Sequence, residues 1–467
     1  MRGRRVSLRA LRRPAVALYV AAAVLLAGAF LAMREVYLLD LPAWLYQGAV
    51  FVRKVAGEDI PHYALKPYPV PNAAATVLFA AAVPALGPHG AAKLWVVGHL
   101  AAAFAVAYAL ARTVEPAQPV ARAAVVVSVL FLSWSFWSGY LNFQMGLLGA
   151  AALAARWRRH GPLAPLGTAA ASVALFFTHF IPFAVFAGAA GLDALRRRDG
   201  RTLGALAPSA ALTGWYVLGR MAGPVSEGVP EPVYAPAGWG QALLYRGYTV
   251  LKLGPFQHFA EFDGRGFLEG VPALYWTLLA LSMAFMAALL TGLALGVVRL
   301  ARTRDARRGW ALAATAVFFG GLLLPAFAFS IVNPGERVVA MGLLGLLAVV
   351  PLPRRLLTGL ALATLLFAAY GLAYLVAHRE GLPPETRARY YAERRAREAA
   401  PPPPEAHVEA FRDPHRNAVE RLHADTRLKY LTHTMYYHAP LYEALARGDY
   451  TLRSFGTGLL AERDLPR

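Results

Sequence analysis

Long runs of apolar residues, separated by short polar gaps, make up most of this chain. The clearest runs are residues 14–33, 92–111, 271–298 and 356–377. Each of them exceeds the roughly 18 apolar residues that mark a transmembrane helix. The pattern predicts an all-α polytopic membrane protein rather than a soluble domain.

The polar gaps alternate in charge. Every second gap is rich in arginine, and short loops rich in Lys and Arg stay on the cytoplasmic side of a membrane. The alternation therefore predicts an N-terminus inside and a C-terminus outside, with about eleven crossings. The basic gaps are residues 2–13, 112–122, 156–159, 196–201, 299–308 and 354–355.

Residues 73–87 are apolar, but they are few and include Pro84. If they crossed the membrane, every later arginine cluster would fall outside, so we expect a re-entrant or juxtamembrane hairpin element instead. The expected crossings are 14–33, 92–111, 122–138, 142–157, 163–179, 180–195, 203–222, 271–298, 309–331, 337–352 and 356–377.

These crossings define a multi-pass domain over residues 1–377, with outer loops at 34–72 and 223–270. Residues 378–467 form a hydrophilic, extracytoplasmic tail, which we expect to be helical or irregular. Within it, residues 384–399 have the composition of a charged helix.

Composition narrows the class of protein. The chain is 57% hydrophobic and 16% charged, with a formal net charge of +20. The six basic gaps hold about 22 of its 47 Lys and Arg residues, so topology and anionic lipid contacts account for the excess and argue against a nucleic-acid partner. With no cysteine, disulfides and thiolate metal sites are excluded. The Ala, Arg, Gly and Pro bias points to a bacterial inner membrane.

The first outer loop contains the most informative acidic residue. Asp40 precedes the stretch 41–55, which has the pattern of an amphipathic interfacial helix. Asp40 has two interpretations. It is a helix N-cap, with Pro42 in the first turn, or it is a carboxylate that accepts a proton from a hydroxyl entering from outside.

Two further residues of this loop are candidates. His62 follows Glu58 and Asp59, but their spacing matches no established metal site, so a solvated turn is favoured over an acid–base cluster and no metal is assigned. Lys66 either contacts a lipid phosphate or extends to the membrane surface as an ordinary lysine.

Later outer turns add polar residues in apolar surroundings. Tyr140 and Asn142 lie in an aromatic segment that an interfacial belt explains in part, although the amide needs a partner. His179 lies at the mouth between two helices, as a packed side chain or as part of a site. Arg337 is costly in an apolar helix unless it is paired. Its partner is Glu336, a lipid headgroup or a substrate phosphate.

Several segments together resemble known membrane proteins. GYLNFQMGLL, a TH pair at a helix end, NPGERVVAMGLLGLLAVVP and YYHAPLYEALARGDYTLRSF look like segments of uncharacterised bacterial multi-pass proteins. These are grouped with the GT-C superfamily of integral membrane glycosyltransferases. The resemblance implies transfer of a hexosyl or pentosyl group from a polyprenyl-phosphate donor to a glycan, lipid or protein hydroxyl outside the cytoplasm.

The resemblance also implies roles for single residues. Asp40 matches the first-loop acid that serves as general base, and Lys66 resembles a loop lysine near the donor phosphate; Arg337 is suited to neutralise that phosphate. Many members have two adjacent acids where Asp40 stands between leucines, and several have an acid where this chain has Asn142. No cofactor is expected, and a divalent metal has no assigned ligand. The alternatives are a non-enzymatic transporter or lipid-handling protein, and an inactive GT-C-like structural subunit.

Overall fold

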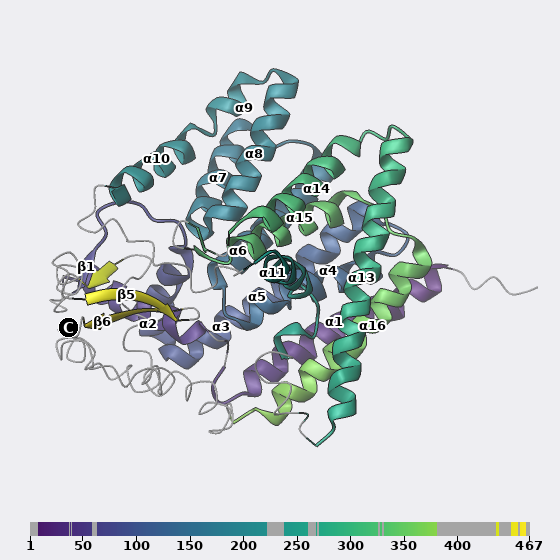
Figure 1. Ribbon diagram of the computed structural model, residues 1–467, viewed down its shortest axis with the longest axis horizontal. Coiled ribbons are helices and arrows are strands. Elements are labelled where there is room, and N and C mark those ends of the chain that lie inside the picture. Colours follow the sequence, from purple (N-terminus) through teal and green to yellow (C-terminus); the bar gives the residue numbers. More distant parts are fainter. Residues whose placement is uncertain are drawn as a thin grey trace, which may run out of the picture.

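The protein is a bundle of helices with a few short strand pairs, as the computed structural model shows (Figure 1). A large apolar core extends through most of the bundle. A smaller core cluster is formed by α7 (Pro165–Thr178) and α8 (Phe180–Arg197). The structure describes residues 8–36, 38, 40–57, 63–221, 238–259, 268, 270–325, 327–328, 331–380, 436–438, 450–455 and 458–463.

The elements follow one another with short connections. The first half of the chain contains α1 (Leu8–Ala32), α2 (Leu41–Val55), β1 (Tyr63–Leu65), α3 (Ala74–Val114), α4 (Pro119–Val126), the π-helix η1 (Val127–Phe131), α5 (Trp134–Trp137), α6 (Leu141–His160), α7, α8, α9 (Gly200–Gly204) and α10 (Ala207–Met221). The second half contains α11 (Trp239–Leu251), α13 (Pro272–Arg302), α14 (Arg308–Leu323), β2 (Phe327–Ala328), β3 (Ile331–Val332), α15 (Pro334–Val349) and α16 (Arg354–Ala377).

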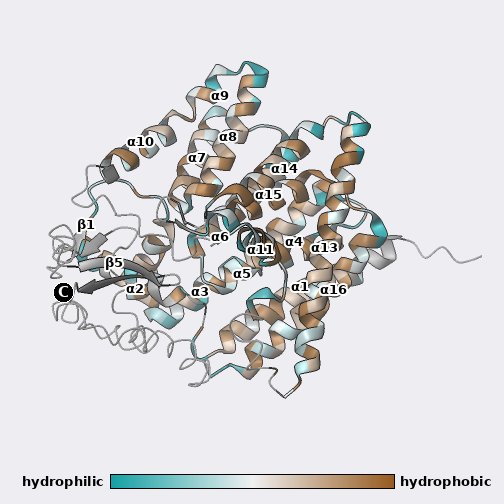
Figure 2. Ribbon diagram, viewed as in Figure 1, coloured by the Kyte–Doolittle hydropathy of each residue, from teal (hydrophilic) through white to brown (hydrophobic). Residues whose placement is uncertain are grey.

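Four helices of the described chain are long and apolar enough to cross a membrane: α1 from Pro14, α3, α13 and α16. Figure 2 shows apolar residues along the helices and hydrophilic residues at many of the turns between them. The protein is therefore embedded in a membrane. Each of the eleven expected crossings contains a helix, but the other seven are shorter or less apolar. Eleven crossings, and their direction, stay a prediction.

Segment 73–87 forms the first part of α3, which bends at Gly87, where φ is +68°. Both ends of this part lie near the same end of the bundle. At its start, the Ala75 N–H donates to a side chain at the start of α6 (2.7 Å). Beyond the bend, Lys93 Nζ donates to Leu31 O in the last turn of α1 (2.9 Å). This path agrees with an element that does not cross, followed by one that does.

The amphipathic helix expected at 41–55 is present as α2. Its apolar face packs on the first part of α3, with Leu41 and Leu45 buried. A Cβ atom at Gly48 would lie within 3 Å of Phe79 and Ala80. The glycine therefore permits the close approach of the two helices.

The arginine-rich turns gather at one end of the bundle, which we call the basic end. Near the end of α6, Arg158 donates to Thr113 O at the end of α3 (3.2 Å). In the last turn of α8, Arg196 lies over the Trp310 ring of α14 (5.9 Å). Because α6, α8 and α15 all end here, their first residues lie at the opposite end, which we call the loop end. Asp40, Tyr140, His179 and Asn333 mark the loop end, where α2, α6, α8 and α15 begin.

Arg122 of α4 fastens two helices together at the basic end. The sequence places it in a basic gap, yet its side chain is fully buried. Its guanidinium donates to Leu347 O, from Nε at 3.1 Å and also from Nη2, and to Val350 O (2.7 Å). The last carbonyls of a helix have no partner within it. Arg122 therefore supplies the donors that the end of α15 lacks.

The described part of the C-terminal tail consists of the strands β4 (Tyr436–His438), β5 (Tyr450–Phe455) and β6 (Gly458–Arg463). β4 pairs antiparallel with β1 of the first loop, and β5 pairs with β6. The expectation of a helical or irregular tail is not met in these segments, where aromatic and Thr residues favour strands. The charged helix expected at 384–399 lies outside the described residues.

Replacing Arg122 should destabilise the bundle. Arg122→Met keeps the length of the side chain but leaves the α15 carbonyls without donors, so we expect a loss of about 2–4 kcal/mol in the free energy of unfolding. Thermal unfolding of the purified protein in detergent measures this loss. The control is Arg159→Met, at an exposed arginine near the end of α6. Equal melting temperatures for the two variants would contradict the role of Arg122.

Candidate functional site

The turn between α5 and α6 holds Asp40 in place at the loop end. The Asp40 N–H donates to Ser138 O (3.1 Å), and Trp44 Nε1 of α2 donates to Gly139 O (3.1 Å). Gly139 has a φ of +73°, and a Cβ atom there would lie 2.7 Å from the Asp40 nitrogen. Only glycine fits this contact, because it combines a left-handed conformation with the close approach of another backbone.

The Asp40 side chain does not act as a helix cap. Asp40 occupies the N-cap position of α2, with proline at the start of the helix, as the sequence predicts. However, its φ and ψ of −97° and −3° are helical, and its carboxylate accepts no capping hydrogen bond. The side chain is half-buried. Its position is therefore determined by the α5–α6 turn, and its carboxylate is not used to begin α2.

Tyr140 lies between candidate residues of opposite charge. The Arg337 guanidinium carbon lies 4.4 Å from the centre of the Tyr140 ring, a cation–π contact. Burial and the nearby Glu336 carboxylate raise the pKa of the Tyr140 phenol above its usual range, and Asp40 adds to this effect. The phenol therefore keeps its proton at neutral pH and can donate a hydrogen bond. Tyr140 connects Asp40 electrostatically with Arg337 and Glu336.

Glu336 forms a buried ion pair with a residue that the sequence did not indicate. Lys252 Nζ lies 2.7 Å from Glu336 Oε1, and both side chains are more than nine-tenths buried. The ammonium also lies over the rings of Trp134 (4.4 Å) and Tyr248 (4.8 Å). Glu336 is in the first turn of α15, where a negative charge is favourable.

Arg337 begins the same helix, next to Glu336. The strongest described partner of Glu336 is Lys252, so the carboxylate is not reserved for its neighbour in sequence. Arg337 Nη1 donates to Asn333 O (3.4 Å), and Asn333 in turn accepts a hydrogen bond from the Tyr245 hydroxyl. The first turn of α15 thus places a cation above Tyr140 on a rigid support.

His179 is a structural cap that faces Arg337. It precedes α8, and its Nδ1 accepts a hydrogen bond from the Ile181 N–H (3.1 Å). Its ring packs edge-on against Phe143, with centroids 5.3 Å apart. Burial, and then the charge of Arg337, lower the pKa of His179 well below its usual value. The imidazole is therefore neutral, with its remaining proton on Nε2.

Asn142 joins the start of α3 to the start of α6. Its Oδ1 accepts a hydrogen bond from the Ala75 N–H (2.7 Å), and its Nδ2 donates to Asn72 O (2.6 Å). The side chain is buried. Both polar atoms of the amide are therefore engaged with the backbone, and its place in a binding site stays a prediction.

The two candidates on the far side of the first loop are not brought into this group. Lys66 is half-buried after β1, in a segment where the Tyr68 ring packs against Tyr216 of α10 (6.2 Å). His62 lies outside the described residues. The candidate site is therefore formed by Asp40, Tyr140 and Arg337, and we call these three residues the loop-end site.

Chemically, the loop-end site combines a carboxylate, a protonated phenol and a guanidinium. A carboxylate accepts a proton, a phenol donates a hydrogen bond to an oxygen, and a guanidinium binds a phosphate in bidentate fashion. The described residues contain no group of three or more His, Cys, Asp or Glu that would hold a metal ion.

Comparisons with known proteins add no relative. No family model, no curated protein and no solved structure matches this chain.

The contact between Gly139 and Asp40 predicts a position-specific effect of a methyl group. Gly139→Ala should lower the free energy of unfolding by about 1–3 kcal/mol more than Gly161→Ala. Both glycines have a positive φ, +73° and +76°, but the added Cβ at Gly161 meets no atom within 4 Å. Chemical unfolding of the two variants in the same detergent measures the difference. Equal losses would mean that the approach of Asp40 does not restrict residue 139.

Proposed function

We propose that the protein is an integral membrane glycosyltransferase of the GT-C type. It would transfer a hexosyl or pentosyl group from a polyprenyl-phosphate donor to a hydroxyl of a glycan, lipid or protein. The observation that supports this best is the grouping of Asp40, Tyr140 and Arg337 at the loop end. A proton acceptor near a phosphate-binding cation suits a reaction that deprotonates a hydroxyl and expels a phosphate.

In this reaction, Asp40 takes the proton of the acceptor hydroxyl while its oxygen attacks the anomeric carbon of the sugar. The bond from that carbon to the phosphate oxygen breaks with inversion, and the electron pair leaves with the polyprenyl phosphate. Arg337 neutralises the leaving phosphate, assisted by Lys66 in the loop. The phenol of Tyr140, which keeps its proton, donates to an oxygen of the donor. The reaction needs no nucleotide.

The proposal places the loop end on the extracytoplasmic side of a bacterial inner membrane. The arginine-rich turns lie at the opposite end, where Arg158 meets the end of α3 and Arg196 meets α14. Short basic loops stay in the cytoplasm. The β1–β4 pairing also connects the C-terminal tail to the first outer loop, as expected if both are outside.

Thiol labelling tests this orientation. The chain has no cysteine, so a single introduced thiol is the only reactive one. Ala56→Cys, at the exposed end of α2, should react with a membrane-impermeant maleimide in intact spheroplasts. Gly200→Cys, at the exposed start of α9, should react only after lysis. The reverse pattern would overturn the orientation and the extracytoplasmic site.

Asp40→Asn tests the chemistry. Because the Asp40 carboxylate does not cap α2, the amide should leave folding unchanged. If Asp40 is the general base, transfer from radiolabelled polyprenyl-phosphate sugars in membranes should fall by about 100-fold or more. The control is Asp193→Asn, which removes a carboxylate that pairs with Arg197 at the basic end. Equal expression of both variants excludes a loss of protein.

Two outcomes would contradict the proposal. Full activity of Asp40→Asn would remove Asp40 from the mechanism, and no transfer by the unmodified protein would contradict the enzyme itself. The second candidate function is a lipid-handling protein without enzyme activity. It is favoured by an apolar cavity of about 780 Å³ that lies along the helices and includes no residue of the loop-end site.

A further inference from the structure

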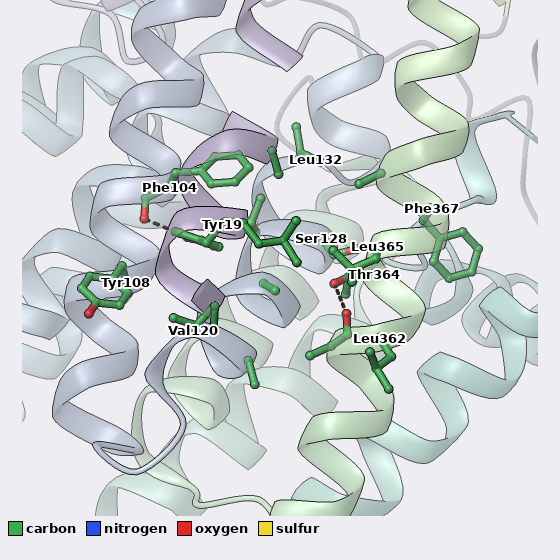
Figure 3. Close-up of a pocket in the computed structure, with 18 of the residues that line it drawn as sticks. Tyr19, Phe104, Tyr108, Val120, Ser128, Leu132, Leu362, Thr364, Leu365 and Phe367 are labelled. Carbon is green, nitrogen blue, oxygen red and sulfur yellow. Dashed lines mark hydrogen bonds between the residues drawn. The ribbon is translucent and has the colours of Figure 1, made fainter. Parts of the chain in front are cut away.

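An apolar groove follows the lipid-facing helices at a distance from the loop-end site. It has a volume of about 780 Å³ and is lined by α1, α3, α4 and α16 (Figure 3). Leu18 and Leu362 line it, and both are more than half exposed. Exposed apolar surface that forms one continuous lining indicates a bound apolar partner.

The hydroxyl groups along the groove leave its walls apolar. The Tyr19 hydroxyl donates to Phe104 O (2.9 Å), and the Thr364 hydroxyl donates to Ala361 O (2.7 Å), as Figure 3 shows. Both hydroxyls are therefore satisfied by the backbone. A ligand in the middle of the groove meets mainly carbon.

The length of the groove matches one layer of a bilayer. On α16 its lining extends from Thr358 to Gly371, which is roughly 20 Å at the rise of an α-helix. On α1 it extends from Ala15 to Leu26, roughly 16 Å. Half of the hydrocarbon core of a bilayer is about 15 Å thick. The groove is thus long enough for the acyl chain of a phospholipid from one leaflet.

The groove has polar groups at the basic end. Arg112 of α3 is exposed and lines the groove there, with its guanidinium 6.0 Å from the Tyr108 ring. Gln118 donates from Nε2 to Thr358 Oγ1 (3.0 Å). Its Oε1 atom is buried and accepts no hydrogen bond from the residues that the structure describes. The groove therefore ends at a cation and at an acceptor that lacks a donor.

The other charges nearby favour an anion. Arg354 and Arg355 are exposed in the first turn of α16, one turn before Thr358. Glu115 is the acidic residue of the same region, but its charge acts on Arg122 and Arg307, and it does not line the groove. A zwitterionic headgroup would bring its ammonium towards these arginines, which is unfavourable.

We infer that the groove binds one anionic phospholipid of the phosphatidylglycerol type, from the leaflet at the basic end. Its phosphodiester binds Arg112, a hydroxyl of its glycerol headgroup donates to Gln118 Oε1, and an acyl chain follows α1 and α16. The site is separate from the loop-end site and does not depend on the proposed enzyme activity.

Native mass spectrometry of the full-length protein, with phosphatidylglycerol or phosphatidylethanolamine added after delipidation, tests this inference. Arg112→Gln should weaken binding of phosphatidylglycerol by about tenfold or more, as expected for the loss of a charge-assisted hydrogen bond. The control is Arg299→Gln, at an exposed arginine in the last turn of α13, outside the groove.

A second pair of variants tests the groove itself without changing charge. Ala368 lines the groove, whereas its neighbour Ala369 is exposed and does not. Ala368→Phe should displace the acyl chain and reduce lipid binding, while Ala369→Phe should leave it unchanged. Both variants place the same residue on the same helix, so a general effect on folding would appear in both.

The expected result is phosphatidylglycerol binding that falls in Arg112→Gln and Ala368→Phe and persists in both controls. Three results would overturn the inference. These are equal binding by all four variants, a preference for phosphatidylethanolamine, and a polyprenyl phosphate in place of a phospholipid as the lipid that copurifies with the unmodified protein.

Discussion

The structure depends on one constraint, which is that polar groups buried within a membrane must find partners inside the protein. Most backbone groups are satisfied within the helices, so the difficulty arises where helices begin and end. Arg122 donates to the last carbonyls of α15, and Asn142 bonds to the backbone that begins α3. His179 accepts from the first turn of α8. Side chains from neighbouring helices or turns thus complete the helix ends.

The same constraint explains why charged residues of the loop end are rigidly held. A buried charge is unfavourable unless it is paired and hydrogen-bonded. Lys252 and Glu336 meet this condition through their ion pair and through two aromatic rings over the ammonium. The first turn of α15 therefore has a defined position, and Arg337, the next residue, is held above Tyr140.

The two ends of the bundle differ in how their charges are used. At the basic end, several arginines remain exposed, including Arg112, Arg354 and Arg355, and they are positioned for anionic headgroups. At the loop end, the charges are fewer and closer to aromatic rings. This division places an electrostatic anchor on one face and candidate chemistry on the other, with the apolar groove along the helices near the anchor.

The amino-acid pattern by itself determined the helical segments, the start of α2 next to Asp40 and the positions of the arginine-rich turns. These features depend on local hydrophobicity, on proline near a helix start and on charge, which neighbouring residues reveal. It also indicated that segment 73–87 differs from a crossing, because its length and Pro84 are visible in the sequence.

Only the tertiary structure decided which distant residues meet. Lys252 and Glu336 are 84 positions apart, and nothing local marks Lys252 as a buried partner. Arg122 resembles any basic-gap arginine until α15 is packed beside it. Asp40 reaches Tyr140 because Gly139 admits its backbone. Each of these contacts follows from the packing of helices that are separate in sequence, and the periodicity of a single helix contains no information about its neighbour.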